Sequence, residues 1–133
     1  MRRQFDLPSF DTDYLGTFGL DWETIVEGPG RWLLIHKWPV PTGYTVENTT
    51  VALQIPPGYP EAQIDMAYFF PALARKDSQP IGRTESAQAL DGKSFQRWSR
   101  HRTNEAPWRP GEDDVATHMA LVDDWLEREF KIR

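Results

Sequence analysis

Residues 31–38 read RWLLIHKW, a run of large aliphatic and aromatic side chains that favours a β strand. The tripeptide Gly-Pro-Gly at residues 28–30 is a turn signal directly before this run. Pro39 and Pro41 end the run, because proline has no backbone N–H to donate to a neighbouring strand. Residues 31–38 are therefore expected to form one strand between two turns.

Three more segments have the composition of strands, and they are residues 22–27, 48–55 and 64–70. In residues 48–55 polar and apolar side chains alternate, as they do in a strand with one buried face. Strands that follow one another across short turns predict an antiparallel meander of four strands. A short, weak helix is expected before them, within residues 9–18, and Gly16 and Gly19 limit its length.

The C-terminal segment has the periodicity of an amphipathic helix. Its apolar residues recur at steps of four, three, four and four, and they are Val115, Met119, Val122, Leu126 and Phe130. That spacing puts them on one face of a helix over residues 112–131. The acidic residues 112–114 are expected in its first turn, where negative charge interacts favourably with the helix dipole.

Residues 71–111, between the last predicted strand and this helix, are rich in proline, glycine and charge. They are predicted to be irregular, and a connection of this length inside a compact domain usually has a function. The expected fold is α+β, with a four-stranded antiparallel meander, a long irregular active-site segment and a closing helix. A chain of 133 residues suits a single domain over residues 1–133.

The composition excludes several classes of site. There is no cysteine, which excludes disulfides, thiolate metal sites and thioester chemistry on this chain. His36, His101 and His118 lack the spacing of zinc ligands, so neither a metal nor another cofactor is expected. His36 lies inside the apolar run 31–38 and is expected to be structural, and His118 is expected to pack at the edge of the core.

Charge and hydropathy bear on the binding partners and on the cellular location of the protein. The formal net charge is −5, although residues 66–104 carry seven basic and three acidic side chains. An acidic protein with one basic stretch is a poor candidate for nucleic-acid binding. The basic stretch is either a solvated loop or a patch facing a partner or substrate. No signal peptide or membrane span is predicted, and a cytoplasmic protein is expected.

Three proline-containing elements occur in a distinctive order. The first is IPPGYP at residues 55–60, the second is FFP at residues 69–71, and the third is WRP at residues 108–110, just before the predicted helix. This order resembles the ubiquitin-conjugating fold, in which one strand ends in a Tyr-Pro corner and the next in an aromatic-x-Pro element. In that fold a Trp-x-Pro element then precedes a helix. The resemblance covers about residues 7–130 and implies the same fold here.

Residues 92–101, followed by residues 108–111, also resemble the prokaryotic family E of ubiquitin-conjugating relatives. Members of that family are predicted to work beside ubiquitin-like proteins, adenylating enzymes and metalloprotease-type deconjugases. The resemblance therefore implies a bacterial ubiquitination-like pathway and these three partners. The chain departs from the wider superfamily in two respects. It has no His-Pro-Asn tripeptide, and no cysteine stands at about residues 95–100, where the superfamily has its own.

The segment that replaces the cysteine contains a hydroxyl and an imidazole. If residues 97–101 are extended, the side chains of Ser99 and His101 point the same way and Trp98 points to the core. Serine needs an adjacent base to act as a nucleophile, and His101 is the candidate. Arg97 and Arg100 are candidates for holding a developing oxyanion. The predicted reaction is acyl transfer, in which Ser99 accepts the C-terminus of a ubiquitin-like protein as an oxyester.

Other interpretations remain open at this point. The second interpretation is that the protein is a non-catalytic adaptor that binds a ubiquitin-like protein or its adenylating enzyme. In that case Ser99 satisfies local backbone groups, and His101 is a surface histidine bonded to a carboxylate. A free-standing Ser/His hydrolase is a third interpretation, but the sequence contains no nucleophile elbow and no evident orienting acid.

Overall fold

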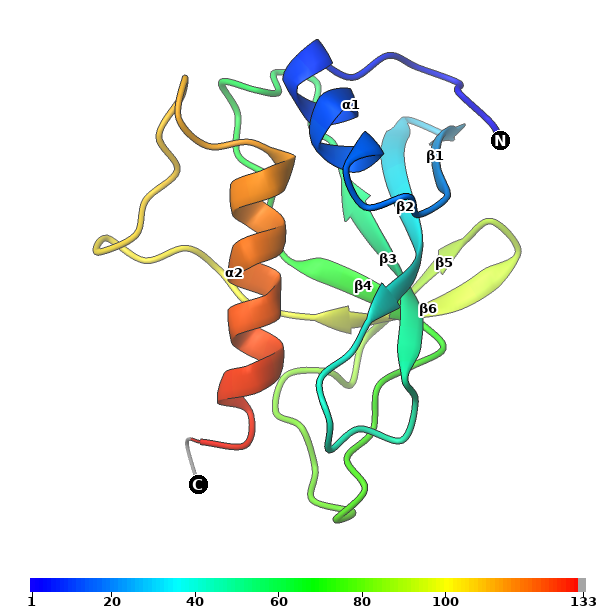
Figure 1. The fold of residues 1–133 in the computed structure, drawn as a ribbon, viewed down its shortest axis with the longest axis vertical. Helices are drawn as coiled ribbons and strands as arrows, with labels where there is room; N and C mark the ends of the chain where they lie inside the picture. Colours follow the sequence, from blue (N-terminus) through cyan, green and yellow to red (C-terminus); the bar gives the residue numbers. More distant parts are fainter. Residues whose placement is uncertain (132–133) are drawn as a thin grey trace.

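The structure is a computed structural model that describes residues 1–131, and these contain two helices and six strands (Figure 1). In chain order they are α1 (Ser9–Gly16), β1 (Trp22–Glu27), β2 (Gly30–Pro39), β3 (Asn48–Gln54), β4 (Ala67–Phe70), β5 (Ala87–Leu90), β6 (Lys93–Trp98) and α2 (Val115–Arg128). The strands form one antiparallel sheet in the order β1-β2-β3-β4-β6-β5. The expected α+β class and the antiparallel meander of the first four strands are therefore confirmed.

The number of strands was predicted wrongly. Residues 71–111, expected to be irregular, contain the hairpin β5–β6, and β6 pairs with β4. Asp91 and Gly92 connect the two strands with φ angles of 53° and 73°. A two-residue turn with positive φ at both positions matches the twist of a hairpin, and Asp-Gly is a common sequence for it. The four-residue β5 contains no β-branched or aromatic side chain, so its composition does not indicate a strand.

Two predicted boundaries also differ. The strand expected from residue 64 begins at Ala67, because Met66 has a φ of 58°, outside the range of an extended strand. The helix expected from residue 112 begins at Val115. Asp114 is its N-cap, since its carboxylate accepts from the backbone N–H of Thr117 at 3.0 Å and the Thr117 hydroxyl accepts from the Asp114 N–H at 3.0 Å. This reciprocal capping box places residues 112–114 before the helix rather than in its first turn.

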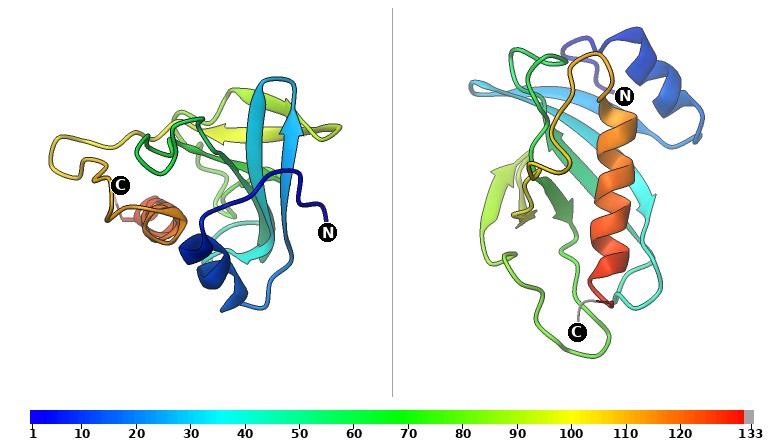
Figure 2. Two further views of the ribbon diagram at one scale, coloured as in Figure 1. Left: turned by 90° about the horizontal axis from the view of Figure 1, so that it is seen from above. Right: turned by 90° about the vertical axis from the view of Figure 1, so that its left-hand side faces the viewer.

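The two faces of the sheet bury different apolar clusters. On one face, β-strand residues such as Leu33, Val51 and Phe69 pack against α2. The predicted helix face is confirmed for Val115, Met119, Val122 and Leu126, which are each fully buried there. Phe130, predicted on the same face of a helix to residue 131, lies beyond the last residue of α2, Arg128, and is partly buried. The sheet is curled, and the β5–β6 hairpin runs across the direction of β1 and β2 (Figure 2). This curl encloses a smaller cluster on the other face, which includes Trp32, Tyr68 and Phe95.

The Tyr-Pro corner is joined directly to the start of α2. The buried carboxylate of Asp11, in α1, accepts from the Tyr59 hydroxyl at 2.6 Å and from the Val115 N–H at 3.2 Å. The Trp108 indole donates to the Pro60 carbonyl at 3.0 Å. These bonds give the Tyr-Pro corner and the Trp-x-Pro element a structural role, because they hold α1, the corner and α2 together.

The burial of His118 predicts a pH-dependent stability. Its side chain lies against the sheet, and Nε2 donates to the Met66 carbonyl at 2.8 Å. Desolvation lowers its pKa to about 4, from 6.5 in the unfolded chain. Between these values the unfolded state binds a proton that the folded state does not, so stability is complete above about pH 6.5 and falls as the pH drops toward 4.

We therefore expect the free energy of unfolding to be about 2 kcal/mol lower at pH 5 than at pH 7 through this group alone. Urea denaturation at the two pH values measures it, with His118→Gln as the matched variant that cannot titrate. The variant should lose stability less steeply between pH 7 and pH 5 than the wild type. Equal slopes in the two proteins would show that His118 is not the responsible group.

Candidate functional site

A serine, a histidine and an aspartate lie in line at the end of β6. The Ser99 Oγ is 3.3 Å from His101 Nε2, and His101 Nδ1 is 3.0 and 3.1 Å from the two carboxylate oxygens of Asp65. With the Nδ1 hydrogen donated to Asp65, Nε2 is free to accept from the serine hydroxyl. The two side chains singled out in the sequence are thus within contact distance of each other.

Asp65 is the residue that sequence reasoning missed. It lies 36 positions before His101, in the connection between the Tyr-Pro corner and β4. No local motif links the two positions, so their pairing depends on the path of both loops. An acid that orients the imidazole was the element that the sequence did not show.

The chain leaves the sheet in a defined way at Trp98. The Trp98 side chain is fully buried, as expected, and anchors the end of β6 in the core. The chain then turns, since the Arg100 N–H donates to the Trp98 carbonyl at 3.0 Å. The extended conformation expected for residues 97–101 therefore ends at Trp98. The Ser99 N–H donates to the Arg83 carbonyl at 3.0 Å, which holds the serine against residues 82–83.

A pocket of about 670 Å³ opens beside the serine. Residues 82–83, residues 99–103, Ala106, the C-terminal part of α2 and Glu129 line it. In the right panel of Figure 2, α2 and the loop that follows β6 lie toward the viewer. Four arginines belong to the lining: Arg83, Arg100, Arg102 and Arg128. Glu129 is the acidic residue among the lining residues, so positive charge predominates.

The four predicted site residues are not all at this pocket. Ser99, Arg100 and His101 line it, whereas Arg97 does not. Arg97 pairs with Tyr68 in the neighbouring strand. Alternation along β6 puts Arg97 on the same face as Phe95, opposite Trp98. A role of Arg97 at an oxyanion stays a prediction.

Arg100 is held close to the serine. Its Nη1 donates to the Gly82 carbonyl at 3.0 Å, its guanidinium lies 4.8 Å from the centre of the Trp98 ring, and its Nη2 is 3.7 Å from Glu129. Burial lowers the pKa of the Arg100 guanidinium, and the Glu129 carboxylate opposes that effect. An arginine remains charged at neutral pH even so, which leaves one positive charge fixed beside Ser99.

The exposure of the site fits reaction with a large partner. The side chain of His101 is 57% exposed and that of Asp65 is 36% exposed. A histidine bonded to a carboxylate at the surface is also what a non-catalytic role predicts. The contact between Ser99 and the second ring nitrogen is the feature that a serine nucleophile requires.

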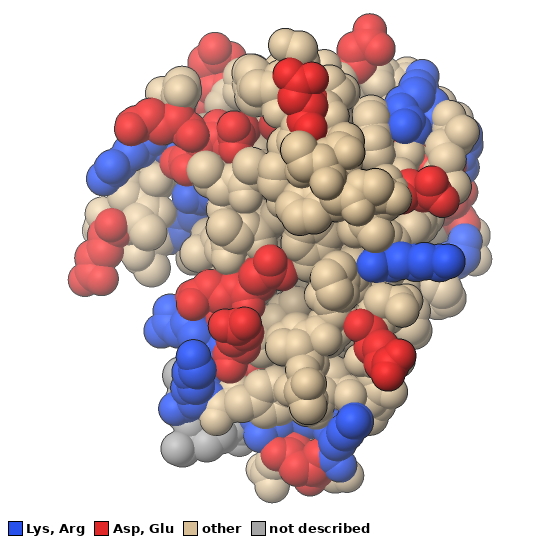
Figure 3. Space-filling view, in the orientation of Figure 1, with Lys and Arg blue, Asp and Glu red and all other residues tan. Residues whose placement is uncertain are grey.

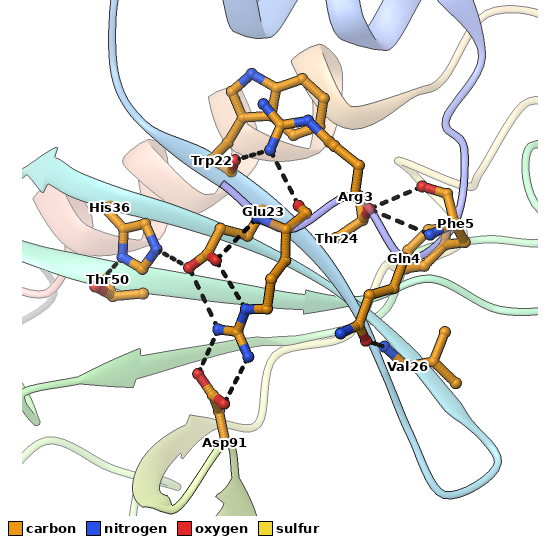
Figure 4. Close-up of polar contacts among 11 residues, drawn as sticks. Arg3, Gln4, Phe5, Trp22, Glu23, Thr24, Val26, His36, Thr50 and Asp91 are labelled. Atoms are coloured by element: carbon orange, nitrogen blue, oxygen red, sulfur yellow. Dashed lines mark hydrogen bonds and ion pairs between the residues drawn. The ribbon is translucent and has the colours of Figure 1, made fainter.

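A second histidine cluster lies on the other face of the sheet (Figure 4). His36 contacts Thr50 at 3.0 Å and Glu23 at 2.7 Å, and Arg2 joins Glu23 at 2.9 Å to Asp91 at 2.7 Å. The hydrogen bond from Arg2 is the main reason that the pKa of Glu23 is lowered to about 2. This network ties the N-terminal segment to β1, β2, β3 and the hairpin turn, which agrees with a structural His36.

Neither sign of charge covers the face drawn in Figure 3, where acidic and basic side chains are interspersed. Within residues 1–131, no group of three or more acidic or histidine side chains is placed to hold a metal ion. Over the same residues, neither helix is long and apolar enough to cross a bilayer.

Comparison with known proteins places the chain in a family. Residues 7–129 match the family model described as prokaryotic E2 family E. No curated protein and no solved structure matches the chain. The matched range contains the Tyr-Pro corner, Asp65, the segment 97–101 and the whole of α2. This protein therefore belongs to prokaryotic E2 family E, and it is a member without a cysteine.

Proposed function

We propose that this protein is a cytoplasmic, ubiquitin-conjugating-like enzyme that accepts the C-terminus of a ubiquitin-like protein on Ser99 as an oxyester. Membership of the E2 family suggests the conjugating-enzyme-like role, with a ubiquitin-like protein and its activating enzyme as partners in general terms. A metalloprotease-type deconjugase completes the proposed pathway. The observation that carries the serine chemistry is the line of contacts from Ser99 through His101 to Asp65.

The proposed fold is that of the ubiquitin-conjugating enzymes. Three features support it: the four-strand meander, the Tyr-Pro corner bonded to the N-terminus of α2, and Trp108 packed on that corner. The β5–β6 hairpin is an addition to the predicted meander, and its second strand delivers Ser99 to the surface.

The first half of the reaction forms the ester. The Ser99 Oγ attacks the carbonyl carbon of the activated C-terminus, and the Oγ proton passes to His101 Nε2. The bond between that carbon and its leaving group then breaks. Asp65 is a positioning residue, because its bond to Nδ1 fixes the ring orientation and leaves Nε2 free to accept the proton. Arg100, which lines the same pocket as Ser99, is the proposed donor to the oxyanion, and one good donor is worth roughly 3 kcal/mol.

The second half resolves the ester. His101 first releases its proton to solvent. An amine or water then passes a proton to His101 Nε2 as it attacks the same carbonyl carbon, the bond to Ser99 Oγ breaks, and that proton moves from Nε2 to Oγ. An oxyester is a less reactive acyl donor than a thioester, so this step depends on the base and on oxyanion stabilisation. His101 and Arg100 supply these two functions from neighbouring positions.

A non-catalytic adaptor is the second candidate. The absence of cysteine and of the His-Pro-Asn tripeptide favours it. A free-standing hydrolase gains an orienting acid in Asp65, but membership of an E2 family favours transfer to a partner over hydrolysis.

The test is a reconstituted reaction with the ubiquitin-like protein, its adenylating enzyme and ATP. We expect a covalent adduct that survives thiol reductants and is cleaved by hydroxylamine or mild hydroxide, as an ester is. Denaturing gels and intact mass spectrometry detect it. Tight binding to the adenylating enzyme without any adduct would favour the adaptor.

Substitutions of His101 and of Asp65 should slow adduct formation to different extents. We expect His101→Ala to slow adduct formation about 100-fold or more, because the serine loses its proton acceptor. Asp65→Asn should slow it at least about tenfold, because the asparagine amide can favour the wrong tautomer. Single-turnover rates measure both, with Glu61→Gln, an exposed change in the same connection, as the control. An unchanged rate in His101→Ala would remove His101 from the mechanism.

A further inference from the structure

We infer that the arginine-lined pocket beside Ser99 binds the nucleotide part of an acyl adenylate, so that Ser99 takes its acyl group directly from the adenylated C-terminus. The inference rests on the proposed function and names its acyl donor. A donor carried as an ester on another enzyme would have no phosphate. The arginines of this pocket would then have no anionic ligand to bind.

Charge is the first reason. Four arginines and one glutamate are among the lining residues, and arginine is the side chain best suited to phosphate oxygens. Two of the arginines are already committed, because Arg100 lies 3.7 Å from Glu129 and Arg128 lies 3.5 Å from Asp124. Arg83 is exposed, and its guanidinium has no hydrogen bond or ion pair with any residue in 1–131. One cation at the pocket is therefore free for an anionic ligand.

Arg102 is the second reason. Its side chain is only 9% exposed, and its one ion pair, with Asp113, is long at 3.7 Å. Its Nε and Nη2 are buried without a hydrogen-bond partner among residues 1–131. An unsatisfied buried donor destabilises the fold, and more so when it is charged. Turning this guanidinium toward a phosphate in the pocket would relieve that cost.

The volume and the apolar part of the pocket suit a nucleoside. Leu121 and Trp125 line it from α2, and the Trp125 ring is supported at 5.8 Å by the ring of His118. Stacking on an aromatic side chain is a common way for proteins to bind a nucleobase, because every base has a π face. The volume of about 670 Å³ lies within the range of small-molecule sites, roughly 300–1,000 Å³.

The position of the nucleophile completes the argument. Ser99 itself lines the pocket, so a phosphate held by the arginines would place the adjoining acyl carbonyl near Oγ. Oγ attacks that carbon, the bond from the carbonyl carbon to the phosphate oxygen breaks, and AMP leaves. The serine proton goes to His101, and the arginines neutralise the charge that develops on the departing phosphate. A mixed anhydride is more activated than an ester, so transfer to a serine runs downhill.

Binding by the whole chain is the direct test. The probes are 5′-AMP and a 5′-O-(N-acylsulfamoyl)adenosine, which mimics an acyl adenylate and cannot transfer its acyl group. Isothermal titration calorimetry should show saturable binding of both, with the mimic tighter than AMP and with AMP tighter than inorganic phosphate or adenosine. Arg83→Gln and Trp125→Leu should each weaken binding of the mimic about tenfold. Arg109→Gln, an exposed arginine outside the pocket lining, should leave it unchanged.

Three results would overturn the inference: no binding of either probe at millimolar concentration, phosphate binding as tight as AMP binding, or an equal loss in Arg109→Gln. Arg83→Gln keeps the test valid if Trp125→Leu is unstable, because Arg83 is exposed. The adduct assay separates this inference from the proposed function. A Ser99 adduct that forms at the wild-type rate in Arg83→Gln would refute the pocket while the function stands. Binding of the mimic with the expected variant pattern, but without any adduct, would refute the serine chemistry alone.

Discussion

Ser99→Ala should abolish the covalent adduct with the ubiquitin-like protein, since alanine has no atom that can form the ester. Ser99→Cys gives the stronger result, because the same position would now carry a thioester. Its adduct should be cleaved by dithiothreitol, which leaves the wild-type adduct intact. Gel analysis after treatment with thiol, hydroxylamine or buffer measures both changes. If this one substitution makes the adduct cleavable by dithiothreitol, the acyl group is attached to residue 99.

Ser94→Ala is the matched control, since Ser94 is an exposed serine in β6, five residues from the site. It should leave the adduct unchanged. An adduct that persists in Ser99→Ala would place the acceptor elsewhere, with Ser94 the next candidate. A base-stable adduct would indicate an amide on a lysine, with Lys37, Lys76, Lys93 and Lys131 as the available acceptors.

Met119→Asp should have the largest effect on stability. Met119 is fully buried between α2 and the sheet, where a carboxylate would have neither water nor a partner. Such a substitution costs several kcal/mol, about 4 or more, which is a large fraction of the total stability of a small domain. Urea denaturation measures it, or the absence of a folding transition if the variant does not fold.

The control for this change is Ala120→Asp, at the exposed neighbouring position of the same helix. It should cost less than about 1 kcal/mol, because it adds only a difference in helix propensity. Wild-type stability in Met119→Asp would contradict the burial of Met119 between α2 and the sheet. Similar losses in the two variants would indicate a general intolerance of charge on α2 rather than burial of residue 119.

Elements with a regular hydrophobic pattern were predictable from the sequence. β3 and α2 have a periodic pattern, β1 and β2 have the composition of strands, and all four lie within a few residues of their expected positions. The β5–β6 hairpin had only the local Asp-Gly signal, without a supporting pattern in residues 87–90. Its place beside β4 could not follow from that turn, because pairing of β6 with β4 depends on the rest of the sheet.

The sequence by itself determined the α+β class, the helix face and the neighbourhood of Ser99 and His101, because periodicity and spacing act over a few residues. Only the tertiary structure decided which acid reaches His101 and what surrounds the serine. Asp65 comes from 36 residues away, and residues 82–83 and α2 bring the arginine-lined pocket to the same place. Those contacts depend on where separate loops lie after the sheet has formed, and no local pattern in the chain specifies that.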